Sequence, residues 1–327
     1  MPAGAPHSHP FFLLYMRGAG LTIASIVHPG EPSCSHPLER PMSSTKDNWF
    51  YEHFDTAGTA FGLRLKQKLE EVQTEYQHIE MWETDTFGYL MTIDGATMLS
   101  TRDNFLYHEM MSHPVLFSHA NPKRVIIIGG GDCGTLREVL RHSSVEKATQ
   151  IDIDEMVTRY SEKYFPELCE SNNDSRAELL FEDGVQYMRD CDDGSVDVII
   201  VDSTDPVGPA EGLFKADFFR DCHRVLADGG IIVQQSESPL LHSDTIIKDL
   251  HANMREAGFS TTQTLPFPQP VYPSGWWSCT LAGKNSDVGS FREADATGKG
   301  FETKYYSAAM HKGALVLPPF MEKAIKG

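Results

Sequence analysis

Five short apolar runs alternate with helical patterns through the second half of this chain. The runs are of strand length and lie at 124–128, 147–151, 177–181, 196–201 and 230–234. Helical stretches follow them at 134–142, 154–164, 184–190, 213–226 and 243–257. Continuous Val and Ile runs separated by helices predict a mostly parallel sheet that is buried on both faces. The pattern therefore predicts an α/β fold whose sheet is flanked by helices.

The segment before this alternation has a different pattern. Short strands are predicted at Tyr76–Trp82, Gly88–Ile93 and Ala96–Leu99. The Asp94-Gly95 pair between the last two indicates a type I′ hairpin turn, which needs positive φ at both positions. A helix is predicted at 104–119. We therefore expect a small antiparallel β domain at 42–102 and a larger Rossmann-like domain with a C-terminal tail at 103–327.

Residues 1–41 require a separate interpretation. Their apolar run, from Pro10 to Val27, is interrupted by Arg17 and by glycines. A transmembrane helix needs about 20 mostly apolar residues, and a signal peptide begins with basic residues, which residues 1–9 lack. We expect a disordered segment or an upstream extension from a misassigned start codon, with an export signal as the alternative, and no membrane association.

The composition excludes some classes of function. The chain has 46 acidic and 28 basic residues and a net charge of -18, which argues against a nucleic-acid partner because phosphates require Lys and Arg. The charge is compatible with a cationic substrate, although an acidic solvated surface explains it as well. Six cysteines without a C-x-x-C pair, and histidines without H-E-x-x-H, predict neither a disulfide framework nor a metal site. Reduced thiols predict a cytoplasmic protein.

The first apolar run leads into a glycine-rich turn. Gly129, Gly131 and Gly134 satisfy G-x-G-x-x-G between a strand and a helix, which is typical of a nucleotide site and fits NAD as readily as other nucleotides. Asp152 closes the next strand, where an acid can accept both hydroxyls of a ribose. Its alternative role is to cap the helix that begins near Asp154.

Three further acids change this interpretation. Asp132 lies inside the glycine turn, where it would repel a pyrophosphate by about 4 kcal/mol per close charge pair at an effective dielectric constant near 20. Asp202 and Asp205 follow another buried strand, in the string Asp-Ser-Thr-Asp-Pro. Ligands of parallel sheets bind at the carboxyl ends of the strands, so this pocket is expected to hold a positively charged ligand. The alternative for Asp202 and Asp205 is an Asx-turn before Pro206.

Together these segments resemble the spermidine synthase family, the polyamine aminopropyltransferases. The matching stretches occur in unbroken order from about residue 46 to 325, and the most specific are Asp202–Ala210 and Tyr272–Gly275. Others are Glu75–Gln77, Asp94-Gly95, Arg102-Asp103, Tyr107–Met110, Ile128–Asp132, Asp183-Gly184, Lys304–Tyr306 and Val316–Pro318. The resemblance implies a methyltransferase-like catalytic domain behind a small N-terminal β domain, in a homodimer or homotetramer.

The resemblance also implies an activity. An aminopropyl group would pass from decarboxylated S-adenosylmethionine, a co-substrate, to putrescine, giving spermidine and 5′-methylthioadenosine without a cofactor. By the family match, the ribose would be held by Asp152, the adenine by Asp183, Gly184 and Pro209, and the aminopropyl ammonium by Asp132 and Asp202 with Gln77 nearby. Putrescine would lie along Tyr107, His108, Asp205 and Tyr272, with Ser203 and Thr204 also binding substrate. Asp202 would accept the proton, assisted by Tyr107.

Two positions depart from the family pattern, and three other functions compete. Asp152 stands where the family often has Glu, and Cys133 replaces a common Gly. The competing functions are an S-adenosylmethionine methyltransferase, a non-catalytic polyamine-binding protein and an NAD-dependent oxidoreductase. Asp132 argues against the first and the third, because it would repel a methionine carboxylate or a pyrophosphate. The acceptor range depends on the groove length, and Trp276 and Trp277 are its expected walls.

Overall fold

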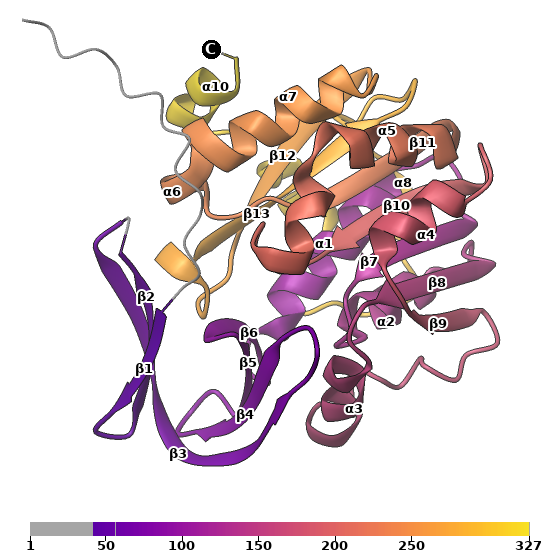
Figure 1. Cartoon of the computed structure of the whole chain (residues 1–327). Coiled ribbons are helices and arrows are strands. Elements are labelled where there is room, and N and C mark those ends of the chain that lie inside the picture. The colour runs from indigo at the N-terminus through magenta and orange to yellow at the C-terminus, as the bar shows by residue number, and fades with distance from the viewer. Residues whose placement is uncertain (1–41, 56, 327) are drawn as a thin grey trace, which may run out of the picture. The chain divides into compact units, whose positions relative to one another are not determined.

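The computed structural model describes residues 42–55 and 57–326, and these residues form two β-sheets with helices around the second (Figure 1). The expected N-terminal extension, residues 1–41, lies outside the described residues. The first sheet is antiparallel and the second is mostly parallel. The chain passes from one to the other through helix α1 (Asn104–Ser118), which begins just after the predicted domain boundary. No helix within the described residues is long and apolar enough to cross a membrane.

The N-terminal sheet has six strands in chain order. They are β1 (Met42–Lys46), β2 (Trp49–Phe54), β3 (Thr59–Gln73), β4 (His78–Thr84), β5 (Tyr89–Ile93) and β6 (Ala96–Ser100). Asp94 and Gly95 have φ of 49° and 84°, as the predicted hairpin turn requires. The first three strands were not predicted, because β3 is largely exposed and lacks a regular apolar alternation.

The second sheet has seven strands in the order β12-β13-β11-β10-β7-β8-β9. The parallel strands are β7 (Arg124–Gly129), β8 (Lys147–Asp152), β9 (Ala177–Phe181), β10 (Val196–Asp202) and β11 (Leu226–Gln235). The helices between them are α2 (Gly134–Leu140), α3 (Glu155–Tyr164), α4 (Gly184–Asp190), η1 (Gly208–Phe214) and α5 (Ala216–Val225). The strand order reverses between β7 and β10, and this switch point is where such sheets bind ligands.

Helices cover both faces of this sheet, as its Val- and Ile-rich strands require (Figure 1). Side chains of α1 and α2 join the core on one face, and those of α4, α5 and η1 join the core on the other. A third cluster packs Val157, Tyr160 and Phe165, from α3 and the turn after it, against β4, β5 and β6. This cluster fixes the N-terminal sheet beside the carboxyl ends of the parallel strands.

The C-terminal part contains elements that the sequence pattern did not reveal. Strand β13 (Trp276–Gly283) pairs antiparallel with β11, and strand β12 (Thr261–Pro268) pairs antiparallel with β13. The two strands extend the sheet beyond β11. They have no continuous Val and Ile run, and β12 carries prolines that an edge strand tolerates. The helices here are α6 (Pro239–His242), η2 (Ser243–Ile247), α7 (Lys248–Glu256), η3 (Pro273–Gly275), α8 (Glu293–Thr297), α9 (Ala308–Ala314) and α10 (Pro319–Lys326). Of these, only η2 and α7 were predicted as helical, by the stretch at 243–257.

Candidate active site

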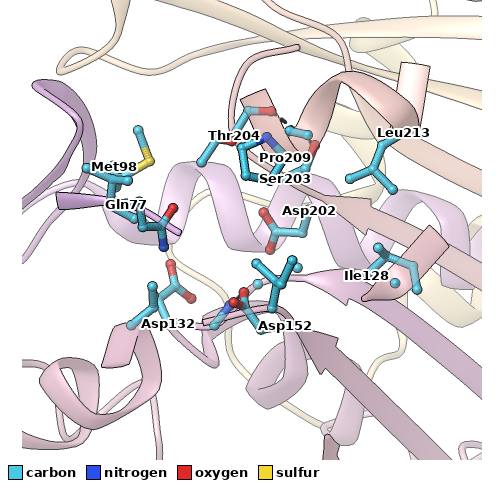
Figure 2. Close-up of a pocket in the computed structure, with 18 of the residues that line it drawn as sticks. Gln77, Met98, Ile128, Asp132, Asp152, Asp202, Ser203, Thr204, Pro209 and Leu213 are labelled. Carbon is cyan, nitrogen blue, oxygen red and sulfur yellow. Dashed lines mark hydrogen bonds between the residues drawn. The ribbon is translucent and has the colours of Figure 1, made fainter. Parts of the chain in front are cut away.

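Three adjoining cavities open where β7 and β10 end. The large cavity, of about 990 Å³, is lined by the glycine turn and by Asp152 and Asp202 (Figure 2). The inner cavity, of about 360 Å³, is lined by Glu52, Asp205 and Trp277. The outer cavity, of about 480 Å³, shares Met98 and Thr204 with both. Among the described residues, every charged side chain that lines the three cavities is a carboxylate.

The glycine turn and the end of β10 are held together by their backbones. Gly129 pairs with Asp202 in the register of the two strands, and the N–H of Gly130 donates to the carbonyl of Asp202 over 2.7 Å. Gly129 has a φ of 80°, and a Cβ there would lie 2.1 Å from that carbonyl oxygen. Only glycine fits at 129, and this close approach brings the two acidic segments into one pocket.

Asp132 is ionised and oriented by two contacts. Its Oδ2 lies 3.0 Å from Nε2 of His108, and its Oδ1 accepts the N–H of Gly134 over 2.7 Å. Burial opposes ionisation, but the contacts with His108 and Gly134 outweigh it and hold the pKa of Asp132 below its usual value. The same pairing overcomes burial at His108 and raises the pKa of that imidazole. The His108 ring contacts Asp132 from behind the glycine turn and lines none of the three cavities.

Asp152 points into the large cavity from the end of β8 (Figure 2). Its carboxylate accepts the N–H groups of Gly131 and Asp154, each over 2.9 Å. The cap of α3 is Asp154, which accepts the N–H of Met156, so the capping role considered for Asp152 is wrong. Burial raises the pKa of Asp152 to about 6.

Asp202 lies at the centre of the site between a tyrosine and a threonine. Its Oδ1 accepts the Tyr107 hydroxyl over 2.7 Å, and its Oδ2 accepts the Thr135 hydroxyl over 2.6 Å. Burial and the nearby charge of Asp132 raise the pKa of Asp202. Burial and Asp202 raise the pKa of Tyr107 well above its usual value, so the phenol stays protonated. A carboxylate with a raised pKa is a stronger base.

Two acids line the inner cavity, and a third, Glu237, lies behind them. Glu52 reaches it from β2, with its Oε2 accepting the N–H of Thr97 over 3.0 Å, and Asp205 reaches it from the end of β10. Glu237, at a φ of 65°, hydrogen-bonds to Asp205 through its side chain and is held by Gln235 over 3.2 Å. Burial raises the pKa of all three acids, to about 8 for Glu52. The raised pKa values reflect three carboxyl groups with no cation among them.

Aromatic side chains close the inner cavity. Tyr272 donates to the carbonyl of Met98 over 2.5 Å, and its ring meets the edges of Tyr107 and Trp277 at centroid distances of 5.9 and 4.8 Å. Trp277 is a wall of this cavity, as expected. Trp276 is not, because it packs on Phe320 in α10.

The remaining predicted residues lie in the same region. Those that line the large cavity are Gln77, Asp183, Gly184, Ser203, Thr204 and Pro209. Figure 2 shows Gln77 on the side of the cavity opposite Ser203 and Asp202. The Asp183 carboxylate also caps α4 by accepting the N–H groups of Val185 and Gln186. Apart from His108, the structure brings all the predicted side chains to one connected set of cavities.

Four residues that line the site or contact its acids were not predicted from the sequence: Glu52, Thr135, Gln235 and Glu237. Gln235 and Glu237 follow the apolar run at 230–234, and the rule that ligands bind at strand ends could have found them. Glu52 gave no such signal, because it lies in a strand that was not predicted.

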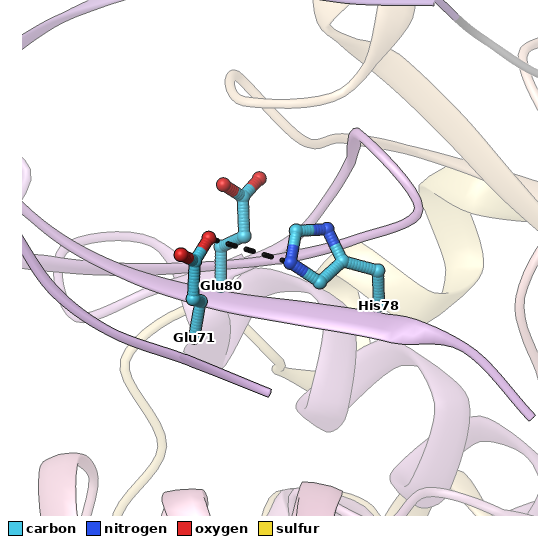
Figure 3. A group of neighbouring side chains, drawn as sticks. All are labelled: Glu71, His78 and Glu80. Carbon is cyan, nitrogen blue, oxygen red and sulfur yellow. Dashed lines mark ion pairs between the residues drawn. The ribbon is translucent and has the colours of Figure 1, made fainter. Parts of the chain in front are cut away.

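One cluster away from the cavities has metal-ligand chemistry. Glu71, His78 and Glu80 have ligand atoms within 4.8 Å of one another on β3 and β4 (Figure 3). The Lys68 ammonium lies 2.6 Å from a carboxylate oxygen of both Glu71 and Glu80, so a cation already balances them. The absence of a functional metal or cofactor stays a prediction.

Comparisons with known proteins agree with this geometry. Residues 104–291 match the family model of the spermine/spermidine synthase domain, and residues 48–101 match that of the spermidine synthase tetramerisation domain. The chain is 62% identical to the polyamine aminopropyltransferase of Xanthomonas campestris pv. campestris (strain B100), over 86% of this chain and 99% of that protein. The relative from Xanthomonas axonopodis pv. citri is 61% identical with the same coverage.

Two solved structures share the fold. A spermidine synthase in complex with the transition state analogue AdoDATO superimposes with a TM-score of 0.82 and 33% identity. The spermidine synthase from Thermotoga maritima superimposes with a TM-score of 0.80 and 33% identity. Each match covers 90% of this chain and 98% of the other.

Proposed function

Because the chain belongs to the spermine/spermidine synthase family of polyamine aminopropyltransferases, we propose that it is a spermidine synthase. It would transfer the aminopropyl group of decarboxylated S-adenosylmethionine to putrescine and release spermidine and 5′-methylthioadenosine. The family relationship makes the chain a transferase of polyamine biosynthesis. We infer the identity of the two substrates from the residues of the site.

The observation that carries the proposal is the sign of the charges in the cavities. Every charged lining residue in the described part of the chain is an acid. The donor carries a sulfonium and an ammonium, and the acceptor carries two ammonium groups at neutral pH. Intact S-adenosylmethionine would add a carboxylate, which Asp132 and Asp202 would repel by about 4 kcal/mol per close pair at an effective dielectric constant near 20. The site therefore favours the decarboxylated donor over a methyl donor.

We place the donor in the large cavity. Asp152, at the end of β8, suits the ribose hydroxyls, and the adenine fits between Asp183 and Pro209. Asp132 and Asp202 would hold the aminopropyl ammonium. Because the contact with His108 keeps Asp132 ionised, the Asp132 carboxylate carries its charge before any substrate arrives.

We place putrescine in the inner cavity, beside Tyr107 and Tyr272. Its far ammonium would lie against Glu52 and Asp205, and its near nitrogen would face the donor beside Asp202. An alkyl amine has a pKa near 10.4, so removing its proton at pH 7 costs about 4–5 kcal/mol. Asp202, whose pKa is raised, accepts that proton, and the desolvation of the amine lowers the cost.

The transfer is an in-line displacement. The nitrogen lone pair of the acceptor forms a bond to the carbon beside sulfur, and the carbon–sulfur pair returns to sulfur. The sulfonium becomes a neutral thioether, and the proton from nitrogen passes to Asp202. Holding both cations against fixed carboxylates provides much of the rate, because the reacting atoms are already aligned.

Mass spectrometry of the reaction products tests the proposal. The enzyme is incubated with either decarboxylated or intact S-adenosylmethionine and with a panel of putrescine, cadaverine and spermidine. We expect spermidine from the decarboxylated donor and putrescine. Methylputrescine from the intact donor, or tight diamine binding without turnover, would reject the proposal.

The variant Asp202→Asn tests the base. We expect turnover to be lost while 5′-methylthioadenosine still binds, because the amide keeps the shape but accepts no proton. Asp193→Asn is the matched control, since that side chain is 76% exposed and pairs with Arg224. A near-normal rate in Asp202→Asn would refute the assignment of the base.

We further propose a cytoplasmic homo-oligomer, dimer or tetramer, that works without a cofactor. The match of residues 48–101 to a tetramerisation domain supports assembly through the N-terminal sheet. Light scattering of the purified chain separates a tetramer from a dimer, and a monomer would contradict the proposal.

A further inference from the structure

Two cysteines meet behind the turn that carries Asp132. The Cys133 thiol lies 3.5 Å from the carbonyl oxygen of Gly131, and the Cys169 thiol lies 3.8 Å from the carbonyl oxygen of Asp132. The two side chains also lie close together, because Cys133 is the largest cause that raises the pKa of the Cys169 thiol. They therefore surround two consecutive peptide groups of the turn, although they are far apart in the sequence.

The backbone of Cys133, one of the two cysteines, has a conformation that is unusual for a residue with a side chain. Cys133 has a φ of 68°, in the left-handed region that favours glycine, and its side chain is fully buried. Such a conformation costs about 1–3 kcal/mol in a residue other than glycine. The buried thiol contacts Cys169 and, over 3.6 Å, the amide of Gln150.

Cys169 is the partner that solvent can reach. It follows α3 in a short turn in which its N–H donates to the carbonyl of Pro166 over 3.2 Å, and it is partly exposed. Among the other described cysteines, Cys222 and Cys279 are fully buried. Cys191 is partly exposed like Cys169, but its side-chain partner is Tyr187.

We propose that Cys133 and Cys169 form an oxidation-sensitive dithiol whose disulfide fixes the Asp132 turn and slows the enzyme. A peroxide is the oxidant. It first oxidises the Cys169 thiol to a sulfenic acid and leaves as water or an alcohol. The Cys133 sulfur then attacks the Cys169 sulfur, a sulfur–sulfur bond forms, and the sulfenic oxygen leaves as water. Two electrons pass from the two sulfurs to the peroxide, and both thiol protons end in the leaving molecules.

The disulfide would act on the turn directly. The Cys169 thiol would no longer donate to the Asp132 carbonyl, and the loop after α3 would be tied covalently to the residue next to Asp132. A displacement of about 1 Å in a positioning element can cost about a hundredfold in rate. This consequence rests on the proposed function, because it assumes that Asp132 holds the donor. Formation of the disulfide does not depend on that function.

The reaction is expected to be slow at neutral pH. The nearby Cys133 side chain and burial raise the pKa of the Cys169 thiol. The thiolate is the reactive form, so its fraction, and with it the rate of oxidation, rises about tenfold for each pH unit below that pKa. The pair would therefore respond to sustained peroxide rather than to brief exposure.

The test combines peptide mapping with activity. The wild-type protein is treated with hydrogen peroxide at pH 7 and pH 8.5, its remaining thiols are alkylated, and its peptides are mapped with and without dithiothreitol. Spermidine formation is measured on the same samples. We expect a Cys133–Cys169 link, a fall in turnover of about tenfold to a hundredfold, recovery with dithiothreitol, and faster oxidation at pH 8.5.

Two variants complete the design. Cys169→Ser should keep the untreated activity and resist peroxide, whereas Cys191→Ser, the matched control, should lose activity as the wild type does. Equal inactivation of Cys169→Ser and wild type, absence of the mapped link, or a link that leaves turnover unchanged would each overturn the proposal. A wild type that forms no spermidine before oxidation would reject the proposed function instead, while the mapping still decides whether the dithiol forms.

Discussion

Glu52 is expected to release its proton when putrescine binds. Its carboxyl is buried in the inner cavity, and burial raises its pKa to about 8. At pH 7 the empty site therefore holds the proton, and removing it costs about 1.4 kcal/mol, the value of one pKa unit. An ammonium 4 Å away stabilises the carboxylate by about 4 kcal/mol at an effective dielectric constant of 20. The attraction exceeds the cost, so binding should expel about 0.9 of a proton from Glu52.

The direction of the pH dependence follows from the same values. The pKa of Glu52 is high in the free enzyme and lower beside the bound ammonium. The free enzyme therefore binds more protons than the complex, and affinity for putrescine should increase as the pH rises from about 5 to 8. Below about pH 5 the contribution of this group to affinity should be largely lost, because the carboxyl is then protonated in the complex as well.

Calorimetry in two buffers measures the released proton. Putrescine is titrated into the enzyme at pH 7 in phosphate and in Tris, with 5′-methylthioadenosine filling the large cavity. The dependence of the observed enthalpy on the buffer's ionisation enthalpy gives the number of protons released. Glu52→Gln should release about 0.9 fewer than wild type, and Glu256→Gln, an exposed control, should match wild type. Equal release from wild type and Glu52→Gln would refute the reasoning.

Two further substitutions test the residues that position Asp202 and His108. Tyr107→Phe removes the hydroxyl that donates to Asp202 over 2.7 Å, and kcat should fall about tenfold to a hundredfold with donor binding unchanged, as measured by steady-state kinetics and calorimetry. A kcat equal to wild type would exclude an assisting role. Gly134→Ala places a Cβ 2.3 Å from the buried His108 ring, and the free energy of unfolding should fall by about 1–3 kcal/mol in denaturant titration. Gly313→Ala, with nothing within 4 Å, is its control, and equal stability of the two variants would contradict the crowding argument.

The parallel half of the fold could be predicted from the sequence because its strands are buried on both faces. Runs such as that of β10 then consist almost entirely of Val and Ile, and no exposed position interrupts them. Parallel strands end at the same edge, so acids that follow β7, β8 and β10 had to lie close together. This rule predicts from the sequence that Asp132, Asp152 and Asp202 share one pocket, as they do in the structure.

The inner cavity could not be predicted in the same way. Glu52 reaches it from an antiparallel strand, and the packing of that sheet against α3 depends on side chains scattered over distant segments. His108 shows a related limit. It matched a family motif, yet its ring packs behind the glycine turn because Gly134 leaves room for it and Asp132 faces it.

The donor end and the acceptor end of the site both face cations, but their carboxyl groups differ in protonation. At the donor end, a contact with His108 keeps Asp132 ionised whether or not a ligand is present. At the acceptor end no basic residue lines the inner cavity among the described residues, and burial keeps protons on its acids until a cation arrives. An Asp132 carboxylate that stays ionised suits a cation that is always charged, because a sulfonium has no proton to lose. An acceptor end that exchanges protons suits an amine, because one nitrogen of that amine must itself lose a proton for the reaction to occur.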